Sequence, residues 1–234
     1  MFILRRMDLL VVPKRSRRSP AKAARTADDP RRRRHQALAE VRRELVLDAA
    51  RSAFFELGME KTSMREIAQR AGYTVGALYS YFASKEEVYG ALLAESLERL
   101  NAEVQKALGR AGDDRERLQV SASAFFDFYR ENPRDLDLGF YLFQGMKPRG
   151  LTPALNEALN ARLRDALRPV QDALEALGLA PDTALAETTA LFAHTVGLLV
   201  LSHTGRIRMF KQASQDLFRA YLDQLLVRAA AGDR

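Results

Sequence analysis

Several side chains between Ser63 and Lys85 could hold the backbone of a nucleic acid. Tyr79 has an aromatic ring that can pack and a hydroxyl that can reach a phosphate. Gly76 has no Cβ, so a helix could bring its backbone close to a duplex at this position. Lys85 stands at the start of an expected helix, where a cation opposes the helix dipole. An anion bound at that helix end would reverse the sign, so we interpret Lys85 as a phosphate ligand.

Two short helices and a tight turn are expected to position these side chains. A glutamate follows Ser63 three residues later, which is the spacing of a capping box, so Ser63 is expected to begin the first helix. Gly72 stands where the chain must turn sharply, and Thr74 can cap the second helix. In that helix Leu78 and Phe82 lie four residues apart and face inward. The pattern is typical of a helix-turn-helix unit, although an ordinary helical corner has the same periodicity.

The order of the residues distinguishes these two possibilities. The run TSMREIA, then AG, TVGALYSYF and SKEE, resembles the DNA-binding domain of the TetR family of transcriptional repressors, over roughly residues 40–100. The resemblance implies phosphate or base contacts at nine positions, which are Ser63, Thr74, Val75, Gly76, Ala77, Tyr79, Ser80, Tyr81 and Lys85.

Two positions depart from the usual pattern of that family. Many members carry a polar or basic residue where Val75 stands, and Thr or Ser where Ala77 stands. Val75 and Ala77 cannot form bidentate hydrogen bonds to purines, but they can contact thymine methyl groups. We therefore expect base readout that is weak in hydrogen bonds and favours T at one or two positions of each half-site.

Residue types needed for other chemistry are scarce. The 234 residues include no Cys and three His, which argues against a disulfide framework, a cysteine nucleophile and a metal centre. We find no HExxH motif and no glycine-rich phosphate loop. The sequence therefore predicts neither an enzyme nor a bound cofactor.

The net charge of +7 is concentrated at the N-terminus. Residues 1–35 hold twelve Lys and Arg against three Asp, so the remaining residues are close to neutral. This charge density without apolar periodicity predicts a disordered basic arm over residues 1–36. One interpretation is an arm that contacts DNA through Arg31, Arg32, Arg33 and Arg34. The other is a solvated tail, or extra sequence from an upstream start codon, since Met7 could also begin the chain.

The rest of the chain predicts an all-α fold in two domains. Residues 37–100 would form the helix-turn-helix domain, and residues 101–234 a helical domain for regulation and dimerisation. A helix from Lys85 to about Leu108 would link them. An apolar run at 190–201 is too short to cross a membrane, so we expect a cytoplasmic protein.

Seven aromatic residues within nineteen positions are the best indication of a ligand cavity. Aromatic-lined pockets are typical of small-molecule sites between helices, although plain core packing would use the same residues. The candidates for binding a small apolar or aromatic effector are Phe125, Phe128, Tyr129, Phe140, Tyr141 and Phe143.

The last two helices are expected to pair with their copies across a two-fold axis, and the family resemblance implies the same homodimer. A dimer would present two recognition helices to a near-palindromic operator on double-stranded DNA. We therefore expect a ligand-responsive repressor. The alternatives are an activator on the same fold and a sequence-neutral DNA-coating protein that relies on the basic tail.

Overall fold

The computed structural model describes residues 30–140 and 151–231, and every regular element in these ranges is helical. This confirms the all-α class. In chain order the elements are α1 (Pro30–Lys61), α2 (Met64–Ala71), α3 (Val75–Tyr79), α4 (Lys85–Leu108), α5 (Asp114–Glu131), α6 (Pro133–Phe140), α7 (Pro153–Ala176), α8 (Pro181–His203), the 3-10 helix η1 (Arg206–Phe210) and α9 (Ser214–Ala231).

The chain divides into two compact units, Met1–Arg43 and Glu44–Arg234. In the first unit the described residues form the beginning of α1, which starts at Pro30 rather than near Ala37. Proline suits the first position of a helix because its missing N–H would have no partner there. Arg31 to Arg34, expected in a disordered arm, are therefore helical. The expected arm before Pro30 lies outside the described residues.

The inward face of α1 differs from the expected one. Val46, Leu47, Ala50, Ala53 and Phe54 are each no more than 8% exposed. The sequence suggests an inward series that repeats every four residues from Val41 to Leu57, with Val46 and Phe54 beside it. Val46, Ala53 and Phe54 are indeed buried, whereas Val41, Leu45 and Leu57 are exposed. An α-helix has 3.6 residues per turn, so such a series rotates by about 40° at each step and leaves one face after two steps.

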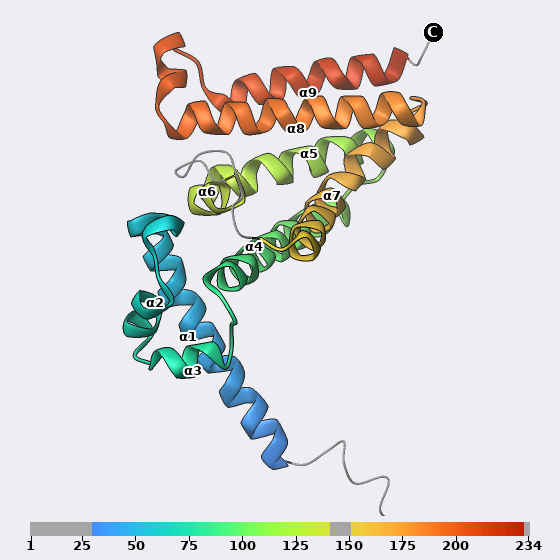
Figure 1. Cartoon of the computed structure of the whole chain (residues 1–234). Coiled ribbons are helices and arrows are strands. Elements are labelled where there is room, and N and C mark those ends of the chain that lie inside the picture. The colour runs from blue at the N-terminus through green and yellow to red at the C-terminus, as the bar shows by residue number, and fades with distance from the viewer. Residues whose placement is uncertain (1–29, 141–150, 232–234) are drawn as a thin grey trace, which may run out of the picture. The chain divides into compact units, whose positions relative to one another are not determined.

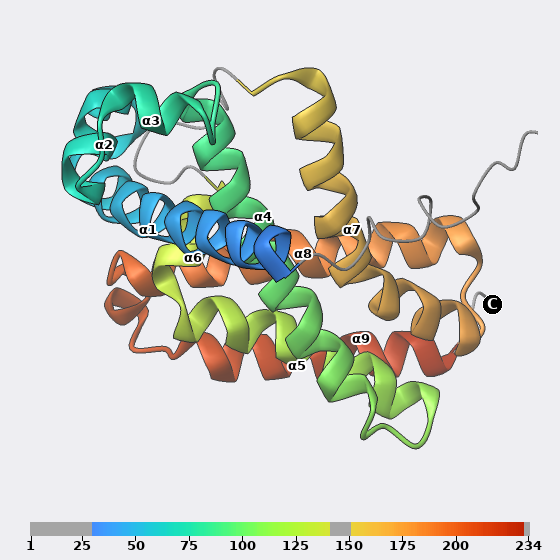
Figure 2. The same cartoon turned by 90° about the horizontal axis from the view of Figure 1, so that it is seen from below.

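α4 follows the turn unit and packs within the second unit. Val88, Leu92, Leu97, Leu100 and Val104 are buried along it, and it packs against α5, α6 and α7. α4 continues without a break through Leu100, where the sequence was divided into two domains, and ends at Leu108. Figure 1 shows α8 and α9 running alongside each other, and Figure 2 shows α2 and α3 as neighbours.

α8 is long and apolar enough to cross a membrane by length and composition, whereas the expectation rested on a shorter apolar run. This is weak support for a membrane span, because the core helix of a soluble protein passes the same test. α8 packs against α5, α7, η1 and α9, and Leu191, Thr195 and Leu199 are among its buried residues. These contacts give the apolar composition a structural reason.

Candidate nucleic-acid interface

The turn between α2 and α3 has the local structure that its residues predict. Ser63 Oγ accepts a hydrogen bond from the Glu66 N–H at 3.1 Å and caps α2. Thr74 Oγ1 accepts from the Ala77 N–H at 3.1 Å and caps α3. Gly72 has φ of 72° and ψ of 27°, a left-handed conformation that favours glycine. The two caps and the left-handed turn between Ser63 and Thr74 therefore set the direction of α3 relative to α2.

An ion-paired arginine holds α2 against α1. Arg70 Nη1 lies 2.8 Å from a Glu56 oxygen on α1, and Arg70 Nε lies 2.7 Å from Glu66. Ser52 also contacts both Arg70 and Glu56. The hydrogen bonds from Arg70 and Ser52 lower the pKa of the Glu56 carboxyl. α2, the first helix of the turn unit, is thus held against α1 by charge as well as by apolar packing.

α3 presents most of its surface outward. Leu78 is its one buried residue, while Tyr79 is 54% exposed. Gly76 is also exposed, and a Cβ built there would meet no atom within 4 Å. Val75 and Tyr81 are half-buried and pack against the core. The packing of the protein therefore gives no reason for glycine at position 76.

The hydroxyl groups near α3 differ in what they can still donate. A hydroxyl has one hydrogen and two lone pairs. Ser63 and Thr74 use a lone pair for their caps, which leaves the hydrogen for a phosphate oxygen. Ser80 Oγ donates its hydrogen to the Ala77 carbonyl at 2.6 Å, so it is less suited to a phosphate contact.

Lys85 is held by the fold, which the sequence did not indicate. Its Nζ donates to the carbonyl oxygens of Met59 at 2.9 Å, Glu60 at 3.4 Å and Thr62 at 3.2 Å. These three bonds occupy all the hydrogens of the ammonium group. At the same helix start, the Glu87 carboxylate accepts from the Ala83 N–H at 2.8 Å. Carbonyl oxygens at and just after the end of α1 therefore explain this lysine without an anion, and its role as a phosphate ligand stays a prediction.

Arg65 is a further cation of this surface that the sequence argument passed over. It lies in the first turn of α2, two residues after Ser63, and is exposed. Among the residues that the structure describes, it forms no ion pair. Its position in the run SMRE was visible in the sequence, but its exposure depends on which face of α2 packs against α1.

The predicted aromatic pocket residues pack against one another. Phe125 and Phe128 have ring centroids 5.2 Å and 5.1 Å from Tyr129, and the Tyr129 and Phe140 centroids are 5.6 Å apart. Phe192 of α8 joins the group, 5.9 Å from both Phe125 and Phe140. Burial raises the pKa of the Tyr129 hydroxyl above its ordinary range. Two further candidates, Tyr141 and Phe143, lie outside the described residues.

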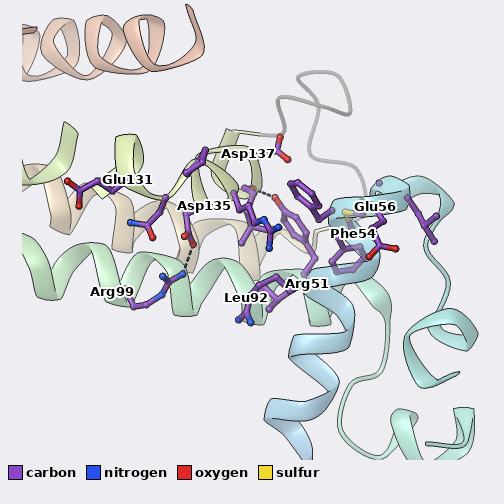
Figure 3. Close-up of a pocket in the computed structure, with 17 residues that line it drawn as sticks. Arg51, Phe54, Glu56, Leu92, Arg99, Glu131, Asp135 and Asp137 are labelled. Atoms are coloured by element: carbon purple, nitrogen blue, oxygen red, sulfur yellow. Dashed lines mark hydrogen bonds and ion pairs between the residues drawn. The ribbon is translucent and has the colours of Figure 1, made fainter. Parts of the chain in front are cut away.

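A cleft of about 820 Å³ lies elsewhere, between α1, α4 and the α5–α6 corner (Figure 3). None of the four described aromatic candidates lines it. Within the described ranges, no group of three or more His, Asp or Glu could hold a metal ion.

α8 has an exposed apolar face, and α9 has one large exposed apolar residue. On α8 the exposed residues Ala190, Ala193, Gly197 and Leu201 recur at helical spacing. On α9, Val227 is 65% exposed. Such a surface is available for contact with another apolar face.

Two family models match the chain. Residues 46–92 match "Bacterial regulatory proteins, tetR family", and residues 118–225 match "Tetracyclin repressor-like, C-terminal domain". The first segment contains the capped turn, α3 and the start of α4, and the second runs from α5 into α9. Together the two segments cover more than half of the chain.

Two curated relatives match part of the chain. The transcriptional activator FasR of Mycolicibacterium smegmatis is 38% identical over 99 residues, which is 42% of this chain and 45% of FasR. The transcriptional repressor KstR2 of Mycobacterium tuberculosis is 38% identical over 86 residues, which is 37% of this chain and 43% of KstR2. The matched part of the chain therefore spans less than half the length of these relatives.

Two solved structures share the fold. The TetR family regulator PfmR of Thermus thermophilus aligns with a TM-score of 0.57 at 26% identity, covering 81% of this chain and 95% of PfmR. FadR of Bacillus subtilis, solved in complex with stearoyl-CoA, aligns with a TM-score of 0.61 at 18% identity, covering 78% of this chain and 97% of FadR. With both family models, the helix-turn-helix geometry and the helical C-terminal region in agreement, this chain belongs to the TetR family of bacterial regulatory proteins.

Proposed function

We propose that this protein is a cytoplasmic transcriptional repressor that binds a near-palindromic operator as a homodimer and responds to a small-molecule effector. The observation that carries the proposal is the outward surface of α3. Leu78 anchors this helix while Gly76 and Tyr79 are exposed, and Gly76 has no neighbour that would exclude a Cβ. A glycine inside a helix costs about 1 kcal/mol relative to alanine. Close approach of a DNA backbone would explain why this helix has glycine at position 76 although alanine would make the helix more stable.

The other groups on this surface suit a duplex in different ways. Ser63 and Thr74 can donate to phosphate oxygens, and Arg65 adds a cation beside them. Val75 and Ala77 are half-buried, and their remaining surface can contact thymine methyl groups. The DNA contacts we propose are therefore made mainly through the backbone phosphates, with weak base readout.

The same proposal gives less weight to three other candidates. Ser80 and Lys85 donate their hydrogens to backbone carbonyl oxygens of the protein. Tyr81 is half-buried against the core. Each of the three would have to change its contacts before it could bind DNA. The helical Arg31 to Arg34 remain candidates for additional phosphate contacts.

Dimerisation through α8 and α9 supports specificity. One short recognition helix reads few base pairs, whereas two on a dimer read half-sites about one helical turn apart. The small exposed residues Ala190, Ala193 and Gly197 would allow two copies of α8 to approach closely across a two-fold axis. This apolar face has no reason to be exposed on a monomer.

Repression is the favoured direction of control. A dimer bound across an operator excludes other proteins from that DNA, and KstR2 is named a repressor. FasR is named an activator, so the same fold serves both outcomes. A promoter–reporter assay with and without the protein separates them, since a repressor lowers the output.

The DNA-binding part is tested by selecting bound sequences from a random pool with the purified protein. We expect a near-palindromic sequence with T at one or two positions of each half-site. Affinity for this site and for random DNA should then be compared at one salt concentration, because phosphate contacts make all such affinities salt-dependent. Equal affinity for the two would show a sequence-neutral DNA-coating protein instead.

Gly76→Ala supplies a variant that should fold and yet bind the selected site less well. Gly109→Ala is a matched control, because Gly109 also has helical backbone angles and an added Cβ there would meet only ordinary contacts, the nearest at 3.6 Å, but it lies at the end of α4, away from α3. Binding of the selected site by Gly76→Ala as tightly as by the parent would contradict a close approach of DNA to this surface.

A further inference from the structure

The cleft at the α1, α4 and α5–α6 junction has an apolar wall and an ionic rim. Its volume of about 820 Å³ lies within the range of small-molecule sites. Phe55 of α1 is the most accessible part of the wall, at 53% exposed. The wall is lined by Phe54, Phe55, Leu57, Met59, Tyr89, Leu92 and Leu138.

Most charges on the rim are already compensated. Arg51 lies 3.2 Å from Glu95, and Arg99 lies 2.5 Å from Asp135. Glu56 is paired with Arg70.

The remaining two carboxylates of the rim are also engaged. Glu131 lies 2.8 Å from Arg130. Asp137 also has an interaction partner within the protein. Each of the four described carboxylates that line the cleft therefore already has an interaction partner.

Arg134 is the exception among the cations. Its guanidinium carbon lies 4.3 Å from the centroid of the Phe55 ring, and among the described residues it has no ion pair. Stacking on an aromatic face fixes the plane of a guanidinium while leaving its N–H edge available. A guanidinium presented in this way suits an acid group that accepts two parallel hydrogen bonds.

We propose that this cleft binds an organic anion with an apolar or aromatic body, whose acid group contacts Arg134 and whose body lies against the wall formed by Phe54, Phe55 and Leu138. This places the effector site outside the aromatic cluster around Tyr129. The four described members of that cluster line no part of the cleft.

The cleft is well placed to affect DNA binding, and this step rests on the proposed function. Phe54 and Phe55 belong to α1, which Arg70 ties to α2, whereas Arg134 and Leu138 belong to α6. An occupant in contact with both sides would favour one separation of α1 and α6. A ligand shifts a conformational equilibrium only by its difference in affinity for the two states.

The chain has no tryptophan, so Phe55→Trp introduces a single indole into the cleft and keeps an aromatic face for Arg134. Energy transfer from this indole to a bound naphthalene dye then reports binding at this place. The probes are anilinonaphthalenesulfonate, an anion with an aromatic body, and phenylnaphthylamine, which has the same body without the sulfonate. The Phe55→Trp protein is the reference for all further variants.

In this background, Arg134→Ala should weaken the sulfonate dye about tenfold, the usual size for loss of a charge-assisted hydrogen-bonded contact. It should change the affinity of the neutral dye by less than about twofold. Arg134→Lys should restore part of the lost affinity because the cation is retained. Arg110→Ala is the control, since Arg110 is an exposed arginine that follows α4 and does not line the cleft.

The proposal is overturned if Arg134→Ala leaves the sulfonate dye bound as tightly as in the reference, or if Arg110→Ala weakens it equally. Absence of energy transfer from the indole in the reference protein would also overturn it. Operator affinity of the Phe55→Trp protein, measured with and without the sulfonate dye, tests the link to DNA. If no preferred DNA site exists at all, the proposed function fails while the dye measurements still decide the binding site.

Discussion

The Nζ atom of Lys85, at the first residue of α4, donates to the carbonyl oxygen of Met59, 2.9 Å away and 26 positions earlier in the chain. Gly58, just before Met59, has φ of 78° and ψ of 159° and ends the regular part of α1. The lysine therefore binds carbonyls that the break in α1 leaves without helical partners. One side chain joins the start of α4 to the segment that leads into α2.

We expect Lys85→Ala to lower the free energy of unfolding by about 1–2 kcal/mol, because three carbonyl oxygens lose a charged donor. Urea denaturation measures the change. Lys61→Ala is the control, since Lys61 is an exposed cation near the same helix end and should change stability little. Equal stability of the Lys85 variant and the parent would mean that these hydrogen bonds contribute nothing net.

Gly76→Ala and Gly72→Ala should have opposite effects on stability. At Gly76 an added Cβ meets nothing and the backbone is helical, so alanine should stabilise the protein by up to about 1 kcal/mol. Gly72 has φ of 72°, so alanine there should destabilise it by about 1 kcal/mol. Thermal unfolding of the two variants is the measurement. A loss of stability in Gly76→Ala would indicate an internal reason for that glycine.

The features that the sequence predicted correctly depend on neighbours along the chain. Ser63 and Thr74 cap helices through N–H groups three residues later, and Gly72 takes a conformation set by its own backbone. Short-range patterns of this kind are visible in a single sequence.

The features that the sequence did not predict depend on distant partners. The carbonyls bound by Lys85 lie 23 to 26 positions away. The Tyr129 cluster is completed by Phe192 of α8. The aromatic residues expected to line a pocket therefore pack against a helix that lies far away in the sequence. Likewise Phe55 and Arg134 meet across the cleft from helices far apart in the chain.

A charge on the exposed face of α8 should separate the proposed dimer. Ala193 lies in the middle of the row of small exposed residues, so Ala193→Arg would bury a cation at the interface without a partner. We expect sedimentation to show monomers for this variant and dimers for the parent. Ala158→Arg on the exposed surface of α7 is the matched control and should remain dimeric. A dimeric Ala193→Arg protein would move the interface elsewhere.

Stability should fall as the pH drops below about 6.5, in part through His194 of α8. Burial lowers the pKa of its imidazole from the ordinary value of 6.5, although a hydrogen bond to the Leu217 backbone opposes this. The ring is stacked on Tyr221 of α9 with centroids 4.2 Å apart, and the Arg228–Glu187 ion pair lies beside Tyr221.

Below pH 6.5 the unfolded chain binds a proton at His194 that the folded protein does not. Lowering the pH therefore stabilises the unfolded state relative to the folded state. The contribution of His194 is therefore complete above that pH and is lost as the pH falls through the lower folded-state pKa. Chemical denaturation of the parent and of His194→Gln at pH 7.5 and pH 5.5 measures it, and the variant should lose less stability between the two. His203→Gln is the control, because that histidine is exposed at the end of α8. Identical losses in the parent and in His194→Gln would show that other groups cause the dependence, the Glu56–Arg70 pair among them.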